Sequence, residues 1–202
     1  LQRFEEILKN NSFIEGPWNA SFEKRFAQMQ GSNHALLVAN GTDALEISLQ
    51  AYGIGKGKKV GVPGISFYAT AECVLNQGAD LVFIDVDPQT GLMDPASLRK
   101  TLERVRLDAI IPVHIYGQPA PIEELEEVCR PHKIKVIEDA AQAQGGFYQN
   151  QKPIGSSQNL VTFSFYPTKN LGAMGDAGAI LTQNDELKDK IQQIRNHGRT
   201  PS

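Results

Sequence analysis

Cysteine is scarce in this sequence, and its two copies, Cys73 and Cys129, stand far apart without Cys-x-x-Cys spacing. Neither a disulfide framework nor a thiolate zinc site is indicated, and reduced thiols in a cytoplasmic protein fit best. No stretch approaches the roughly 18 apolar residues that a spanning helix needs. The first residues, LQRFEEILKN, also lack the apolar run of an export signal. The sequence therefore favours neither export nor membrane insertion.

An excess of either charge is missing as well. Twenty Lys and Arg stand against 23 Asp and Glu, for a formal net charge of -3. That balance does not favour binding to nucleic acid or to an anionic membrane surface. The four histidines show no metal-ligand spacing, so no metal site is predicted. What is present is a chain of 202 residues, 41% of them hydrophobic, which is enough to bury a sizeable core.

Short apolar, β-branched runs alternate with longer segments of helical periodicity, which is typical of an α/β fold with a mostly parallel (mixed) sheet flanked by helices. Strands are predicted at 35–39, 59–62, 81–85, 109–113, 134–138, 160–165 and 177–182. Helices are predicted at about 2–9, 20–30, 43–52, 68–77, 95–105, 121–131 and 185–196. Pro and Gly cluster at the joints, so one domain is expected. Open sheets bind ligands beyond the carboxyl ends of their strands, where site residues are sought.

A glycine turn, Asn40-Gly41-Thr42-Asp43, follows the first predicted strand and opens a helix. The free backbone N–H groups and the positive dipole end of a helix suit a phosphate, and Thr42 adds a hydroxyl donor. The alternative is that Thr42 or Asp43 merely caps the helix. The glycine- and lysine-rich segment 53–58 follows a helix instead of a strand, so it is interpreted as a turn and not as a nucleotide-binding loop.

The strand 134–138 leads into Asp139, and Gln142 follows about one helical turn later. Both side chains are expected to face one bound ligand. A carboxylate at the end of so apolar a strand needs a cation or hydrogen-bond donors, because burying an unmatched charge is costly. The alternative interpretation of Asp139 is a helix N-cap.

The most specific stretch is FSFYPTKNLG, from Phe163 to Gly172, in which a strand ends near a proline and leads through Lys169 into a glycine turn. We expect this lysine to be partly enclosed. A neutral lysine amine attacks an aldehyde and forms a Schiff base. Taken alone, a loop lysine is more often a solvated residue, but its conjunction with the other motifs favours chemistry.

Together these motifs resemble the DegT/DnrJ/EryC1/StrS family of sugar aminotransferases, which depend on pyridoxal 5'-phosphate and have fold type I. The likeness runs in order through FIEGPWNASFEKRFA, NGTDAL, GVPGISFYATAECV, FIDVDPQTGLMD, IIPVHIYGQPA, VIEDAAQAQGG, FSFYPTKNLGAMGDAGAILT and RNHG. The resemblance implies that residues 1–202 are the cofactor-binding large domain, without the small C-terminal domain of the family. It also implies a homodimer whose partner subunit contributes to the site.

The resemblance assigns roles to single residues. Lys169 is the lysine that forms the Schiff base and moves the substrate's Cα proton, and Asp139 is the partner of the pyridine nitrogen. Gln142 is implied to hydrogen-bond the ring hydroxyl oxygen, and Phe67 to stack on the ring. The group implied to hold the 5'-phosphate is Gly41, Thr42, Asp43 and Ser164.

The implied activity is transfer of an amino group from an amino acid, glutamate by resemblance, to a nucleotide-linked keto-sugar. It belongs to amino-sugar biosynthesis for a surface polysaccharide or a secondary metabolite. The alternative is a truncated non-catalytic or regulatory relative that binds the cofactor or a sugar nucleotide. A sugar dehydratase of the same family is disfavoured, because those relatives have histidine at the position of Lys169. Trp18 and Tyr116 are candidate sugar contacts, with simple packing as the alternative. His114 follows a strand and is a candidate to approach the ligand, but a histidine at such a position is at least as often a structural hydrogen-bonding residue.

Overall fold

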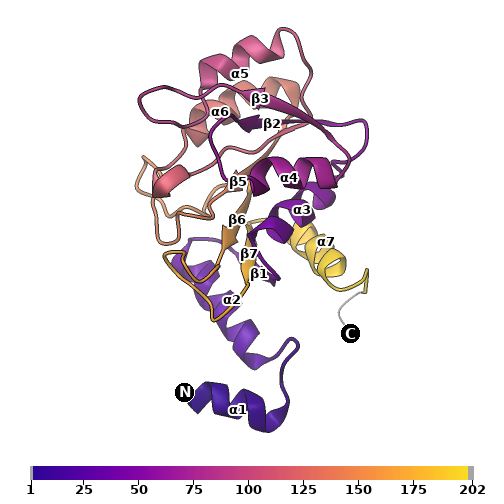
Figure 1. Cartoon of the computed structure of the whole chain (residues 1–202), viewed down its shortest axis with the longest axis vertical. Coiled ribbons are helices and arrows are strands. Elements are labelled where there is room, and N and C mark those ends of the chain that lie inside the picture. The colour runs from indigo at the N-terminus through magenta and orange to yellow at the C-terminus, as the bar shows by residue number, and fades with distance from the viewer. Residues whose placement is uncertain (1, 200–202) are drawn as a thin grey trace.

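The fold is organised around one seven-stranded sheet with the order β1-β7-β6-β5-β4-β2-β3 (Figure 1). The structure is a computed structural model and describes residues 2–199. Neighbouring strands are parallel, except that β7 is antiparallel to both β6 and β1. The predicted α/β class with a mostly parallel mixed sheet is confirmed.

The elements follow the predicted order along the chain. The strands are β1 (His34–Val38), β2 (Lys59–Pro63), β3 (Asp80–Ile84), β4 (Ala109–Ile110), β5 (Lys135–Asp139), β6 (Leu160–Ser164) and β7 (Gly178–Thr182). The α-helices are α1 (Gln2–Asn10), α2 (Pro17–Met29), α3 (Gly41–Ala51), α4 (Ala69–Asn76), α5 (Pro95–Leu102), α6 (Ile122–Cys129) and α7 (Asp185–Arg195). Two short 3-10 helices are η1 (Ile115–Gly117) and η2 (Arg130–His132).

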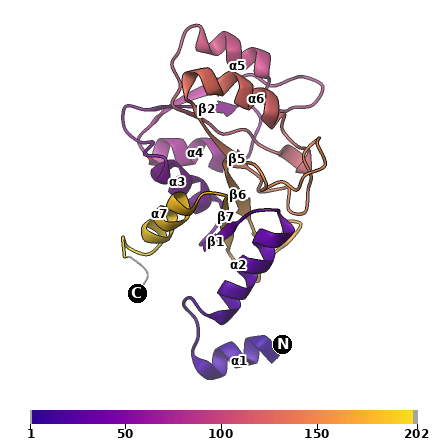
Figure 2. The ribbon, with the colours of Figure 1, turned by 180° about the vertical axis from the view of Figure 1, so that it is seen from behind.

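Helices cover both faces of the sheet, with α3, α4 and α7 on one face and α2, α5 and α6 on the other (Figures 1 and 2). Helix α1 lies apart from the sheet in both views. Consecutive strand residues serve opposite faces: Val136 packs in the cluster with Leu125 of α6, and Ile137 packs in the cluster with Leu49 of α3. Because side chains alternate along a strand, the consecutive residues Glu138 and Asp139 point to opposite faces.

Two predicted boundaries were wrong for identifiable reasons. Strand 109–113 is paired only over Ala109–Ile110, with an isolated bridge from Val113 to Asp139. Pro112 has no backbone N–H to give to a ladder, although its carbonyl accepts the Asp139 N–H at 2.9 Å. Helix α2 begins at Pro17 instead of residue 20, because proline is well tolerated at the first helical position.

The carboxyl ends of β1, β2, β5 and β6 lie at the same edge of the sheet. Strand β1 runs in the direction of β6, since both are antiparallel to β7, and β2, β4, β5 and β6 are joined by parallel pairing. The segments that follow these strands are therefore brought together from distant parts of the chain.

None of the described helices is long and apolar enough to cross a membrane.

Candidate active site

A cavity of about 490 Å3 lies at this edge of the sheet, walled by the segments that follow β1, β2, β5 and β6. Its lining contains all but one of the residues predicted to bind the cofactor: Gly41, Thr42, Phe67, Asp139, Gln142, Ser164 and Lys169. The residue outside the lining is Asp43. The sheet thus brings an amine, a carboxylate and a helix N-terminus to one enclosed space.

Helix α3 begins at the cavity, and its cap differs from both residues that the sequence suggested. The Asn40 Oδ1 accepts the Asp43 N–H at 2.8 Å, so Asn40 is the N-cap instead of Thr42 or Asp43. Asp43 thereby contributes its N–H to the cap. Gly41 and Thr42 occupy the first helical positions, where backbone N–H groups have no acceptor within the helix. These two positions, and not Asp43, face the cavity.

Close packing at Gly41 draws the start of α3 against the end of β6. A Cβ on Gly41 would lie 2.8 Å from the Cβ of Ser164, which is nearer than side chains approach. On the other side, a Cβ on Gly178 of β7 would clash with the Asn40 carbonyl oxygen. The two glycines let the helix begin directly above β6 and β7, so that its N-terminus and Ser164 form one cradle.

Asp139 ends β5 and is buried, with 5% of its surface exposed. Its Oδ2 accepts the Thr70 hydroxyl at 2.8 Å, and its Oδ1 accepts the Ala141 N–H at 3.1 Å. Turns follow the strand here, so Asp139 is not the N-cap of an α-helix. Burial raises the pKa of Asp139 above its ordinary value, although these donors and the positive charge of Lys169 act in the opposite direction.

Lys169 lies half-buried on a tight loop after β6. Its backbone N–H donates to the Tyr166 carbonyl at 2.8 Å, and the Ala173 N–H donates to the Phe165 carbonyl at 2.7 Å. A Cβ on Gly172 would come within 2.6 Å of the Pro167 carbonyl oxygen, so glycine allows this closure. The loop holds Lys169 in the wall of the cavity that Asp139 also lines.

The remaining predicted residues are distributed between the wall and the rim. The Gln142 Oε1 accepts the Tyr116 N–H at 2.6 Å, which leaves the amide nitrogen as a donor. Tyr116 has φ +56, and its side chain is 85% exposed and outside the lining. Phe67 lines the cavity with an exposed ring. Trp18 lies beneath the Arg3 guanidinium at 4.8 Å and does not line the cavity.

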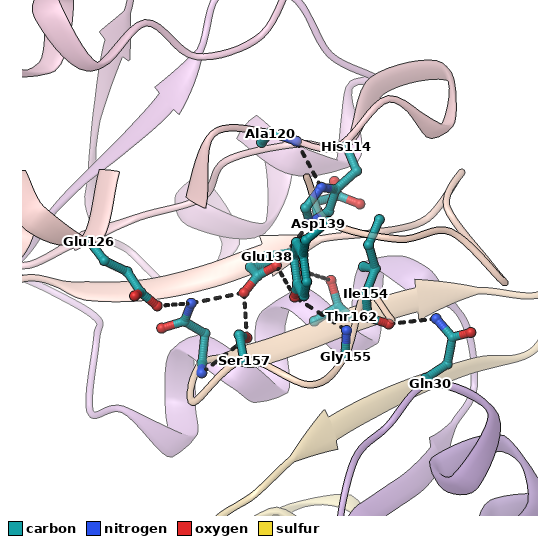
Figure 3. A network of polar contacts seen from close by, with 12 residues as sticks. Gln30, His114, Ala120, Glu126, Glu138, Asp139, Ile154, Gly155, Ser157 and Thr162 are labelled. Carbon is teal, nitrogen blue, oxygen red and sulfur yellow. Dashed lines mark hydrogen bonds and ion pairs between the residues drawn. The ribbon is translucent and has the colours of Figure 1, made fainter. Parts of the chain in front are cut away.

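A polar network around Glu138, drawn in Figure 3, was not predicted from the sequence. Glu138 is fully buried and accepts four side-chain donors: His114 Nε2 at 2.9 Å, Tyr148 OH at 2.7 Å, Ser157 Oγ at 2.6 Å and Asn159 Nδ2 at 2.8 Å. The Ala120 N–H donates to Nδ1 of His114 at 3.0 Å, so the proton of the neutral imidazole is on Nε2. The interpretation of His114 as a structural hydrogen-bonding residue is confirmed.

The donors decide the ionisation of Glu138. Burial acts to raise its pKa, but the hydrogen bonds from His114, Ser157 and Asn159 outweigh burial and lower the pKa below its ordinary value. The carboxylate is therefore ionised at neutral pH inside the protein. The donors come from segments that the sequence separates, so no local pattern could have revealed them.

A second unpredicted residue, Gln144, joins the ends of β5 and β6. Its side-chain amide donates to the backbone carbonyl of Ala141 at 3.2 Å and to that of Ser164. Because the Ala141 N–H also donates to Asp139, the Gln144 amide links the segment that carries Asp139 to the end of β6 at Ser164.

Among residues 2–199, no three His, Cys, Asp or Glu side chains gather in a way that could hold a metal ion.

The model of the DegT/DnrJ/EryC1/StrS aminotransferase family matches residues 1–202. The chain belongs to this family. It is 42% identical to the "Pleiotropic regulatory protein" of Geobacillus stearothermophilus over 100% of its length, and 41% identical to the "UDP-2-acetamido-2-deoxy-3-oxo-D-glucuronate aminotransferase" of Pseudomonas aeruginosa over 96%. Each match covers 54% of the relative, so the chain spans about half the length of these curated relatives.

Solved structures of aminotransferases share the fold. NtdA from Bacillus subtilis with bound cofactor PMP matches with a TM-score of 0.86 and 34% identity, covering 94% of this chain and 42% of that one. Membership of the DegT/DnrJ/EryC1/StrS family indicates pyridoxal 5'-phosphate as the cofactor.

The residues of this family member fit that cofactor chemically. Among residues 2–199, the buried carboxylate of Asp139 has two donors, and it lines the cavity, so a cationic N–H would complete its hydrogen bonds. The start of α3, brought close to Ser164 by Gly41, offers N–H groups to an anion such as a phosphate. Lys169 supplies an amine in the same cavity.

Proposed function

We propose that this fold is the cofactor-binding domain of a pyridoxal-phosphate-dependent aminotransferase. The reaction is transfer of an amino group from an amino acid, glutamate, to a nucleotide-linked keto-sugar. The observation that carries the proposal is the presence of Lys169 and Asp139 in the wall of one cavity, next to the start of α3. An amine, a buried carboxylate and an anion cradle match the aldehyde, ring nitrogen and phosphate of a single small molecule.

When bound, pyridoxal 5'-phosphate supplies a ring that accepts electrons and a carbon that carries the amino group. The Asp139 carboxylate keeps the ring nitrogen of the cofactor protonated, because an anion stabilises a neighbouring N–H cation. The Lys169 amine would take the proton from the substrate's Cα and pass it to the cofactor carbon that carries the amino group. The start of α3 and Ser164 bind the phosphate, while Phe67 covers one ring face and the Gln142 amide donates a hydrogen bond.

A nucleotide-linked sugar as amino acceptor is supported by the names of relatives. The Pseudomonas aeruginosa relative acts on a UDP-linked 3-oxo sugar according to its name. Amino-sugar biosynthesis for a surface polysaccharide or a secondary metabolite, in the cytoplasm, is the corresponding cellular role. Tyr116, exposed near the site, remains a proposed sugar contact, and Trp18 is the weaker one because it lies under Arg3.

A homodimer is part of the proposal. The segments around the cavity expose large apolar side chains, among them Phe67 at 71%, Tyr68 at 67% and Met174 at 97%. Apolar side chains that gather on one surface commonly mark a protein interface. We propose that a second copy of the chain covers these side chains and completes the mouth of the cavity.

The test is a spectroscopic titration of the purified protein with pyridoxal 5'-phosphate. Binding through Lys169 is expected to give a visible absorption band that borohydride abolishes, leaving the cofactor attached to the peptide that contains Lys169. Lys169→Ala should lose the band and reduce amino transfer by about 10^2- to 10^4-fold. Lys100→Ala, which changes an exposed lysine of α5 outside the cavity, is the matched control. A colourless protein that binds no cofactor would refute the proposal.

A second candidate is a regulatory protein that binds the cofactor or a sugar nucleotide without turnover. It is favoured by one observation, the 42% identity to a relative named a pleiotropic regulatory protein. The two candidates differ in turnover with glutamate and a panel of keto-sugar nucleotides. Release of 2-oxoglutarate supports the aminotransferase, and cofactor binding without release in any combination supports the regulatory protein.

A further inference from the structure

The side-chain hydroxyl groups of Thr70 and Ser66 form a series of hydrogen bonds that ends at Asp139. Ser66, in the turn after β2, lines the cavity, and its Oγ lies 2.6 Å from the Oγ1 of Thr70 in the first turn of α4. Thr70 is 1% exposed and donates to Asp139 Oδ2 at 2.8 Å. The three side chains come from two separate segments and form a continuous chain of hydrogen bonds.

The direction of these hydrogen bonds follows from the chemistry of the groups. An ionised carboxylate only accepts hydrogen bonds, so the Thr70 hydroxyl proton must point to Asp139. Thr70 has then used its only proton, and the contact with Ser66 requires the Ser66 hydroxyl to donate to Thr70. Both protons therefore point toward the carboxylate, and hydrogen bonds in such a chain strengthen one another.

Within the part of the protein that the structure describes, Asp139 has two donors, the Thr70 hydroxyl at the end of this series of hydrogen bonds and the Ala141 backbone N–H. We propose that Thr70, supported by Ser66, is a positioning residue that keeps the Asp139 carboxylate ionised and fixed in orientation toward the cavity. Its importance for catalysis rests on the proposed function, because there Asp139 meets the cofactor ring. The effect of Thr70 on the Asp139 carboxylate is present in the protein without cofactor.

Other charged and titratable groups face Asp139 from each packed element. His114 lies in the segment after β4, Lys169 on the loop after β6 and Cys73 on α4. The Thr70 hydroxyl acts against burial, which raises the pKa of Asp139. Removing the hydroxyl destabilises the anion relative to the acid, so the pKa of Asp139 must rise further.

The experiment compares Thr70→Val, which keeps the shape and removes the hydroxyl, with Thr70→Ser, which keeps the hydroxyl. The Asp139 carboxyl is titrated by carbon-13 NMR in protein without cofactor, and its signal is assigned with Asp139→Asn. We expect the pKa of Asp139 to rise by about one unit in Thr70→Val, the effect of one hydrogen bond to a charged group. Thr70→Ser should titrate like the parent.

The second measurement is the dissociation constant for pyridoxal 5'-phosphate, obtained by fluorescence at one neutral pH. We expect about a tenfold increase in Thr70→Val and rescue in Thr70→Ser. Ser66→Ala leaves the buried threonine in place and should shift both quantities in the same direction by less, so it tests the proposal even if Thr70→Val does not fold.

The outcomes separate the two proposals. Equal titration of Asp139 in the parent and in Thr70→Val overturns the role of Thr70, and so does equal behaviour of the Val and Ser variants. If the titration shifts but no variant binds the cofactor, the role of Thr70 stands and the proposed function fails. If cofactor binds equally in every variant and the titration does not move, only the role of Thr70 fails.

Discussion

Glu138 and Asp139 are consecutive residues of β5, and their surroundings are opposite in kind. Glu138 is fully buried among four side-chain donors, and its pKa is lowered (Figure 3). Asp139 has two donors and borders a cavity, and burial raises its pKa. The protein itself solvates the first carboxylate, which makes it part of the fold. The second carboxylate, Asp139, has fewer hydrogen-bond donors, as expected for a carboxylate that binds a ligand.

The largest expected effect separates the two residues by stability. Glu138→Ala removes the acceptor of four donors, of which His114 Nε2 and Tyr148 OH are buried, so the free energy of unfolding should fall by about 3–5 kcal/mol in urea denaturation. Asp139→Ala is the matched truncation on the other face and should cost less, about 1–2 kcal/mol, because it removes the acceptor of two donors at the border of a cavity. Equal losses in the two variants would mean that Asp139 is as structural as Glu138.

The second effect is on cofactor binding, which a change at Asp139 should weaken more than a change at Glu138. Asp139→Asn removes the charge from the cavity and should weaken pyridoxal 5'-phosphate binding by about 10- to 100-fold, as expected for a lost hydrogen bond to a charged group. Glu138→Gln, which changes the carboxylate outside the cavity, is the control and should bind the cofactor nearly as tightly as the parent. Fluorescence titration at one pH measures both, and equal weakening would contradict the comparison.

The third effect concerns the cradle between α3 and β6. Gly41→Ala places a methyl group 2.8 Å from the Cβ of Ser164, and overpacking of this kind costs about 1–3 kcal/mol. The same variant should bind inorganic phosphate and cofactor more weakly. Gly64→Ala introduces a methyl group into open space after β2 and serves as the control. If urea denaturation finds Gly41→Ala as stable as the parent, the space between Gly41 and Ser164 accommodates a methyl group and the account of the cradle is wrong.

The smallest effect is the pH dependence of stability, in which the two residues have opposite signs. The pKa of Glu138 is lowered below 4.5, so its contribution is complete above that pH and is lost as pH falls through the folded pKa. The pKa of Asp139 is raised above 3.8, so its ionisation costs stability as pH rises from 3.8 through the folded pKa. Each slope is at most about 1.4 kcal/mol per pH unit.

Urea denaturation across this acid range measures both slopes. Glu138→Gln should reduce the loss of stability toward low pH, and Asp139→Asn should reduce the loss toward higher pH. Parallel pH profiles for the two variants would contradict the assigned pKa directions.

The sequence predicted the parts of this molecule that depend on local pattern. The runs that became β5, β6 and β7 were placed within a residue or two because they are rich in apolar and β-branched residues and almost entirely buried on both faces. Strand 109–113 was predicted too long, because a hydrophobicity pattern does not register the N–H that Pro112 lacks. Lys169 and Asp139 were singled out because they come at or after the ends of apolar strands, where an open sheet binds ligands, and the roles predicted for them rest on the resemblance to the family.

The unpredicted features depend on pairs of residues that only folding brings together. The donors to Glu138 come from segments near 114, 148 and 157–159, and Thr70 reaches Asp139 from α4. The cap of α3 was assigned to Thr42 or Asp43, whereas Asn40 had the right spacing to the Asp43 N–H. That error was avoidable, since a cap side chain accepts from the N–H two or three residues later.

The central claim is that Lys169 and Asp139 bind opposite sides of one cofactor ring. A crystal structure of the protein with pyridoxal 5'-phosphate tests it most directly. We expect the cofactor's C4' atom bonded to Lys169 Nζ, its ring nitrogen within hydrogen-bond distance of an Asp139 oxygen and its phosphate at the start of α3. A cofactor attached to another lysine, or a ring nitrogen directed away from Asp139, would contradict the account.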